Sequence, residues 1–229
     1  MLDRHFSERE APTVLTLPSF EASPLLWRAV GVSERIFAGM LLALTSPLLL
    51  IAALIIAILA RRTPLIAHKR AGEGGRELWL VKLRTMWGGD SHKRCNSLVE
   101  RLPVTGPENP VVKKKNDPRV TSVFAARCRC YSIDEFPQLW HVVRGQMALV
   151  GPRPLTEYEI EQYYGKDSRL LLSRKPGITG LWQVNGRSRL SYRQRRRLDI
   201  FLIRKWSLSL YLLILARTFQ RAFSGKDAW

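Results

Sequence analysis

The chain has 229 residues, and its 37 lysines and arginines against 19 aspartates and glutamates give a formal net charge of +18. Hydrophobic residues make up 46 % of the sequence, which excludes a disordered basic tail and allows one catalytic domain with an anchor. The positive charge predicts anionic partners, namely nucleic acid, the anionic face of a membrane or a phosphorylated substrate.

The first predicted segments are a lead-in and an apolar helix. Residues 1–31 are expected to form an irregular lead-in, because prolines and acidic residues recur there and no signal-peptide pattern is present. Residues 36–60 carry no charged side chain, and their number is sufficient for a helix that spans a membrane. The sequence therefore predicts a membrane helix near the N-terminus.

Two details of this helix leave its topology open. Ser46 and Pro47 interrupt the apolar run, and proline removes a backbone donor and kinks a helix. Arginine flanks the run at both ends, at Arg35 and Arg61, and positive charge favours the cytoplasmic side of a membrane. Both a re-entrant helix over 32–62 and an ordinary kinked transmembrane helix fit this pattern.

Residues 63–229 are predicted to form a mixed α/β, helix-rich domain. Residues 77–84 read as a strand that places Lys82 and Arg84 on one side. The glycine-rich stretch 70–75 before it is interpreted as a hairpin turn, because no Gly-Lys-Ser/Thr sequence of a phosphate-binding loop follows. Residues 123–149 are predicted to be mostly helical.

The central motif is Asp134-Glu135, two adjacent carboxylates at an expected helix start. Ser132 and Glu135 fit a capping box, and Pro137 is tolerated in a first helical turn. A helix N-terminus offers free N–H groups to a phosphate, and adjacent helical residues do not share a face. The two acids are therefore expected to have different roles, unless they are ordinary first-turn acids stabilised by the helix dipole.

Basic residues and turns complete the candidate site. Arg129, Arg153 and Arg187 lie in or beside turn-rich elements, and arginine binds phosphate in a bidentate manner, although each alone is also a plausible surface charge. A second apolar stretch, 198–219, carries interspersed charges and aromatic residues. It is compatible with an interfacial amphipathic helix and with a buried helix of the domain core.

These motifs resemble those of the bacterial sugar transferase family, the monotopic phosphoglycosyl transferases of the undecaprenyl-phosphate pathway. The resemblance runs from about Val32 to the C-terminus and does not cover the lead-in. The motifs that carry it are Lys82-Leu83-Arg84-Thr85-Met86, Asp117-Pro118-Arg119-Val120-Thr121, residues 132–140, Gly151-Pro152-Arg153-Pro154-Leu155 and residues 176–187.

The resemblance implies a membrane enzyme of the bacterial inner membrane. A re-entrant helix over 32–62, broken at Ser46 and Pro47, would hold a cytosolic catalytic domain over 63–229, with an interfacial C-terminal helix. The active site would face the cytoplasm. Anionic lipids would hold the basic domain at the membrane surface.

The resemblance also implies a reaction. A UDP-sugar would bind with Mg²⁺, and Asp134 would attack the phosphorus that bears the sugar, releasing UMP. Undecaprenyl phosphate would then take the sugar phosphate from the aspartyl intermediate, in early exopolysaccharide or capsule assembly. Glu135 would handle metal or protons, and Asp134 and Glu135 would hold the metal. The residues that match the family's phosphate-binding positions are Arg129, Arg153, Arg187, Lys82 and Arg84.

Some choices stay open. Phe136, His141, Gln146, Ala148 and Phe124 depart from the family pattern and leave the sugar undetermined among galactose, glucose and N-acetylated sugars. The sequence does not give the oligomeric state. An alternative is a non-catalytic, membrane-bound basic module that binds nucleic acid or a protein partner. It would bind with a strong salt dependence and gives Asp134 no role, so a transferase without nucleic acid is preferred.

Overall fold

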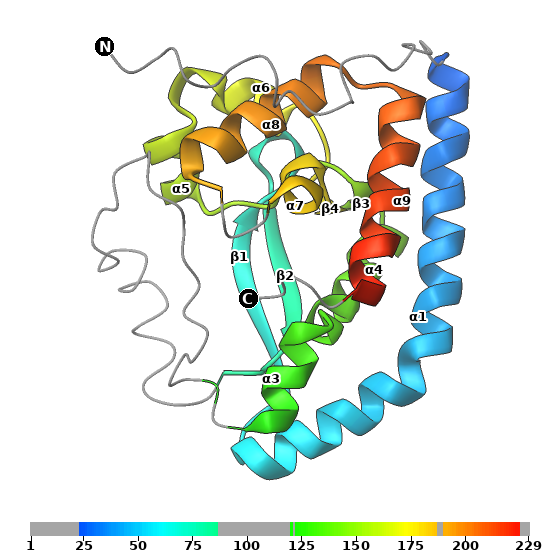
Figure 1. Ribbon diagram of the computed structural model, residues 1–229, viewed down its shortest axis with the longest axis vertical. Coiled ribbons are helices and arrows are strands. Elements are labelled where there is room, and N and C mark those ends of the chain that lie inside the picture. The colour runs from blue at the N-terminus through cyan, green and yellow to red at the C-terminus, as the bar shows by residue number, and fades with distance from the viewer. Residues whose placement is uncertain (1–22, 87–119, 121, 187–189, 225–229) are drawn as a thin grey trace.

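The computed structural model describes residues 23–86, 120, 122–186 and 190–224, and the account below concerns these residues. Helix α1, Pro24–Ala60, runs along one side of a domain in which short helices surround two small sheets (Figure 1). Ser23 caps α1 by accepting a hydrogen bond from the Leu26 amide, and Pro24 occupies the first turn, where its missing N–H costs nothing. Residues 24–31, expected in the irregular lead-in, are therefore helical.

Helix α1 is bent into two limbs (Figure 1). Pro47 lies inside it and cannot donate to the helical ladder. The two hydroxyl groups before Pro47 bond to the helix backbone. Thr45 Oγ1 donates to the Leu41 carbonyl and Ser46 Oγ to the Ala43 carbonyl, each at 2.8 Å. The sequence predicted an interruption at Ser46 and Pro47, and the structure has a bend there within one continuous helix. In the described part of the chain, α1 is the helix long and apolar enough to cross a membrane.

A β-hairpin follows α1. Strand β1, Leu65–Ala71, pairs antiparallel with β2, Glu77–Leu83, from Leu65 opposite Leu83 to Ala71 opposite Glu77. The turn holds a short 3₁₀-helix, η3, Glu73–Gly75, in which Gly74 and Gly75 adopt positive φ angles of 66° and 78°. Glycine reaches this conformation without strain. Both the predicted strand and the hairpin interpretation are confirmed.

A second sheet joins two segments that the sequence separates. Strand β3, Ala148–Val150, pairs in parallel with β4, Gly177–Thr179. The Gly151 amide donates to the Thr179 carbonyl and the Gly177 amide to the Pro152 carbonyl, each at 2.9 Å. A Cβ atom on Gly151 or Gly177 would overlap neighbouring backbone, so glycine permits the close approach. The motif that begins at Gly151 and the motif that begins at Pro176 thus lie side by side.

Helices make up most of the remaining domain. Residues 123–149 are mostly helical, as predicted, in α3, Val123–Cys130, the 3₁₀-helix η4, Ile133–Gln138, and α4, Leu139–Val143. The later helices surround the second sheet (Figure 1). They are α5, Glu157–Tyr163, η5, Gly165–Asp167, α6, Ser168–Leu172, α7, Leu181–Asn185, α8, Tyr192–Arg204, and α9, Leu208–Ser224.

The C-terminal apolar stretch is not one helix. It divides into the end of α8 and the start of α9, because Ser207 ends the connection and its hydroxyl accepts from the Leu210 amide at 3.3 Å. Leu202 of α8 and Ile214 of α9 are both fully buried, in a core cluster with Val150 and Leu181. The apolar faces of both helices therefore belong to the domain core, as the packing alternative required.

Glu34 fastens the first limb of α1 to this domain. One carboxylate oxygen of Glu34 accepts from the Leu149 amide of β3 and from the Tyr211 hydroxyl of α9, each at 2.8 Å. Since both hydrogen bonds are partly buried, one side chain of the anchor helix satisfies two polar groups that are shielded from water. The anchor and the second sheet are therefore one packed unit.

Candidate active site

The acidic pair lies on η4, whose start differs from the predicted cap. Ser132 has a left-handed conformation, with φ 56°, and its side chain makes no capping hydrogen bond. Instead, the Glu135 amide donates to the Ser132 carbonyl, and the Glu135 carboxylate forms an ion pair with Lys82 at 2.7 Å. A capping serine would need an extended backbone, so the predicted capping box is wrong. Its glutamate is used in a tertiary contact with β2.

The two carboxylates have different surroundings, whereas their predicted difference in role stays a prediction. Asp134 is buried, with 8 % of its surface exposed, whereas Glu135 is partly exposed beside Lys82. Burial raises the pKa of the nearby Cys128 thiol, and the negative charge of Asp134 adds to that rise. The Asp134 side chain thus lies near Cys128 of α3.

A cleft brings together three of the residues that the sequence singled out. Lys82 of β2, Glu135 of η4 and Arg153, which follows β3, all line it. Glu135 therefore faces positive charge from the hairpin and from the turn after β3, which suits a substrate with several phosphate oxygens. Its neighbour Asp134 is buried and is not among the residues that line the cleft. The other residues of the lining are Arg70, Leu80, Gln138, Pro154, Gly177, Ile178 and Gln183.

Other predicted residues have different places. Arg84 is buried beyond the end of β2, where its Nε donates to the Thr63 carbonyl at 2.8 Å and its Nη2 to the Thr63 hydroxyl at 3.0 Å, so it ties the exit of α1 to the hairpin. Arg129 lies in the last turn of α3 and does not line the cleft. Arg187 falls outside the described residues.

Three polar residues of the cleft were missed by the sequence reasoning, namely Arg70, Gln138 and Gln183. For Arg70 a signal existed. Position 70 pairs with Leu78 and position 66 with Lys82, so alternation places Arg70 on the same face of the hairpin as Lys82. Arg70 is also held from behind, since its guanidinium lies 3.6 Å from the Glu159 carboxylate of α5.

The donor set of the acidic pair fits a magnesium ion. Carboxylate oxygens are the protein ligands that Mg²⁺ prefers, and it is commonly held by one or two of them together with substrate phosphates. Asp134 and Glu135 offer this set, and among the described residues no group of three or more His, Cys, Asp or Glu side chains could hold a metal alone. A metal at this site would therefore depend on the substrate for part of its coordination.

Comparison with known proteins shows which family has a similar sequence. A family model described as "Bacterial sugar transferase" matches residues 28–225. The chain is 42 % identical over 156 residues to the "UDP-galactose-lipid carrier transferase" of Erwinia amylovora, a match that covers 68 % of this chain and 32 % of that protein. It is 36 % identical over 197 residues to "Exopolysaccharide production protein ExoY" of Rhizobium meliloti, covering 82 % of this chain and 84 % of the relative.

A third relative matches nearly the whole chain. The "UDP-glucose:undecaprenyl-phosphate glucose-1-phosphate transferase" of Caulobacter vibrioides is 34 % identical over 229 residues, covering 95 % of this chain and 80 % of that protein. The chain thus spans about a third of the length of the Erwinia relative and most of the length of the other two.

Proposed function

The chain is an enzyme of the bacterial sugar transferase family, and we propose that it transfers a sugar 1-phosphate from a UDP-sugar to undecaprenyl phosphate. The observation that carries the proposal is the cleft, in which Glu135, paired with Lys82 and adjacent to Asp134, faces Arg153. An acidic group able to attack phosphorus beside cations able to bind phosphate is the arrangement that phosphoryl transfer through a covalent intermediate requires.

In the first step, a carboxylate oxygen of Asp134 attacks the phosphorus that bears the sugar. The bond from that phosphorus to the bridging oxygen breaks, and UMP leaves with the bonding electrons. The product on the enzyme is an aspartyl phosphosugar. Lys82 offsets the charge on the phosphate oxygens while the bonds rearrange, and Arg70 and Arg153, which also line the cleft, bind the donor phosphates.

In the second step, a phosphate oxygen of undecaprenyl phosphate attacks the same phosphorus. The bond to Asp134 breaks, which restores the carboxylate and gives undecaprenyl diphosphate sugar. Lys82 keeps the Glu135 carboxylate within 2.7 Å and thereby fixes the acid that is placed to manage protons or a metal. Magnesium bound by Asp134, Glu135 and the donor phosphates would neutralise part of the phosphate charge.

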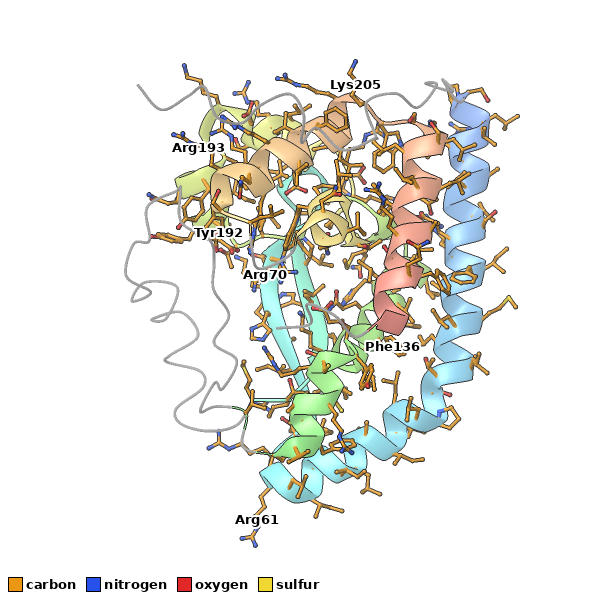
Figure 2. All side chains as sticks on the ribbon, viewed as in Figure 1. Arg61, Arg70, Phe136, Tyr192, Arg193 and Lys205 are labelled. Carbon is orange, nitrogen blue, oxygen red and sulfur yellow. The ribbon has the colours of Figure 1, made fainter. Side chains whose placement is uncertain are left out.

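The anchor suits an acceptor that stays in a membrane. We propose that α1 enters and leaves on the cytoplasmic face of the bacterial inner membrane, because it is bent at Pro47 and arginines flank its apolar run. Figure 2 shows Arg61 at the free end of the second limb and Lys205 at the opposite end of the molecule. The net charge of +18 would add attraction to anionic lipid.

The topology can be tested with single cysteines at Ser33 and Arg62, on opposite sides of the apolar run. A re-entrant helix predicts that a membrane-impermeant thiol reagent labels both positions from the cytoplasmic side only. Labelling of the two from opposite sides would identify a spanning helix. The native cysteines would be replaced by serine first, with retained activity as the check on folding.

The donor is proposed to be UDP-galactose or UDP-glucose, the two that the names of relatives mention, for a step of exopolysaccharide or capsule assembly. The test is UMP release from a panel of UDP-sugars with Mg²⁺ and undecaprenyl phosphate. Asp134→Asn should abolish release, whereas Asp167→Asn, a like change at a surface ion pair with Arg196, should not. Equal turnover in wild type and Asp134→Asn would reject the covalent mechanism.

A further inference from the structure

A carboxylate that the mechanism above does not use lies behind the cleft. Resting on the proposed function, we propose that Asp199 of α8 is a positioning residue whose buried negative charge holds Arg153 and Arg195 so that Arg153 faces the donor phosphates. It acts through the arginines and does not touch substrate.

The burial of Asp199 is complete. None of its surface is exposed, and its Oδ2 accepts a hydrogen bond from the Tyr164 hydroxyl at 2.7 Å. Within the described part of the chain, Oδ1 has no hydrogen-bond partner. An ionised carboxylate with a single hydrogen bond is costly to bury, so packing alone would be served better by a neutral side chain. Its position therefore indicates a need for charge.

That need is visible in the two arginines nearby. The Arg195 guanidinium carbon lies 4.5 Å from the centroid of the Trp182 ring, and that of Arg153 lies 5.6 Å from the same centroid. Trp182 is itself buried, so one ring brings two like charges together in the interior. Burial lowers the pKa of Arg195, and the charge of Arg153 lowers it further. A buried carboxylate offsets this repulsion.

Arg153 connects this cluster to the cleft. It follows β3, lines the cleft with Lys82 and Glu135, and lies over the face of Trp182. Arg195 is held in addition by Tyr192, whose ring centroid lies 5.5 Å from its guanidinium carbon and whose hydroxyl donates to Glu159 at 3.2 Å. Arg153 has no ion pair of its own in the described residues, and its orientation therefore depends on Trp182 and on the field of Asp199.

The charge on Asp199 should change near neutral pH. Burial raises its pKa to about 7, while the Tyr164 hydrogen bond and the charges of Arg153 and Arg195 lower it. These are the groups that face it, from the end of α5, from the turn after β3 and from α8 itself, and Glu159 of α5 acts on Arg195. The carboxylate is ionised above about pH 7 and protonated below it, so the hold on Arg153 should weaken as pH falls.

The experiment is steady-state kinetics of the enzyme in nanodiscs from pH 6 to 8.5, with whichever UDP-sugar supports UMP release in the panel described above. The diphosphate diester of the donor does not titrate in this range. At pH 8, Asp199→Asn should raise KM for the donor about tenfold and leave kcat within about twofold, as expected for a lost ground-state contact. The wild-type rise in KM below pH 7 should be absent in the variant. Asp167→Asn, the matched surface change, should behave as wild type.

Two further measurements keep the inference falsifiable. Tyr164→Phe keeps the carboxylate but removes the bond that lowers its pKa, so it should shift the midpoint of the KM profile to higher pH. Binding of UDP, followed by the rise in Tm, should be weaker in Asp199→Asn even without turnover. An unchanged KM, profile and UDP affinity in folded Asp199→Asn, or an unchanged midpoint in Tyr164→Phe, would overturn the role. Inactive wild type that still binds UDP would instead reject the proposed function.

Discussion

The two walls of the cleft are built differently. On the first wall, called the reacting wall below, Lys82 and Glu135 form a short ion pair between the hairpin and η4, and Glu135 is next to Asp134 in sequence. On the second wall, called the orienting wall below, Arg153 is placed by Trp182 and Asp199, which come from elements far apart in the chain. The first wall can carry the bond-making chemistry, while the second can only bind and orient. Changes on the first should reduce kcat, and changes on the second should raise KM or reduce stability.

The largest expected effect is on the reacting wall. Asp134→Asn should lower turnover by at least about a thousandfold, because an amide oxygen is a poor nucleophile and no covalent intermediate can form. The measurement is acid quenching with a donor labelled in its sugar. Wild type should retain labelled protein in the absence of acceptor, and Asp134→Asn should retain none. Labelled Asp134→Asn protein would locate the nucleophile elsewhere.

The ion pair of the same wall should show the next largest effect. Lys82→Met removes the charge but keeps most of the side-chain volume, and it leaves Glu135 without its ammonium partner. We expect kcat to fall about a hundredfold, as for the loss of one charge-stabilising donor at a transition state. Lys82→Arg should recover part of the loss. If Lys82→Met raised KM alone, Lys82 would act in binding, as the residues of the orienting wall do.

The link between the anchor helix and β3, the strand that precedes Arg153, should matter for stability. Glu34→Ala leaves the Leu149 amide and the Tyr211 hydroxyl without their acceptor. Two unsatisfied buried groups should lower the free energy of unfolding by about 2–4 kcal/mol. Thermal unfolding in nanodiscs would measure it. Glu34→Gln keeps an acceptor oxygen and should lose less. Equal stability in wild type and Glu34→Ala would show that α1 and the second sheet are held by packing alone.

Asp199 should also make the stability of the protein depend on pH. Its folded pKa of about 7 lies above the ordinary value of 3.8, so the folded state retains a proton that the unfolded state loses. The stabilisation from this group is complete below the lower value and is lost as pH rises through the upper one. The rise of about three pKa units corresponds to about 4 kcal/mol, so Asp199→Asn should gain up to about this amount relative to wild type between pH 4 and 8. A constant difference across this range would contradict the assignment.

Local patterns predicted the first wall better than the second. Period-two alternation gave the strand that carries Lys82, and the acidic motif located Asp134 and Glu135. The predicted capping box is wrong because a serine and a glutamate three residues apart form a cap only if the serine is extended. In the structure Ser132 is left-handed, and the Glu135 carboxylate pairs with Lys82. His141, one of the positions that depart from the family pattern, is buried and accepts from the Val81 amide at 3.3 Å.

No comparable sequence pattern predicted the orienting wall. Asp199 lies in a helix rich in arginine, where the sequence suggests one acid among surface charges. In the structure it is buried and bonded to Tyr164, which another segment contributes. The same limit affected the apolar segments. α1 leaves large side chains such as Leu44 exposed, at 78 %, while Ile214 of α9 is fully buried. Hydrophobicity alone does not distinguish a side chain covered by lipid from one covered by protein.

The sequence by itself determined the elements whose causes lie within a few residues. These are the apolar helix with its proline bend, the β1–β2 hairpin, the Gly/Pro turns and the acidic pair beside them. Tertiary structure decided which charges meet. It turned Arg84 to the exit of α1, brought Arg70 and Arg153 to the cleft, and buried Asp199. Electrostatic contacts depend on distance in space, and residues up to 177 positions apart, such as Glu34 and Tyr211, come together only when the chain packs.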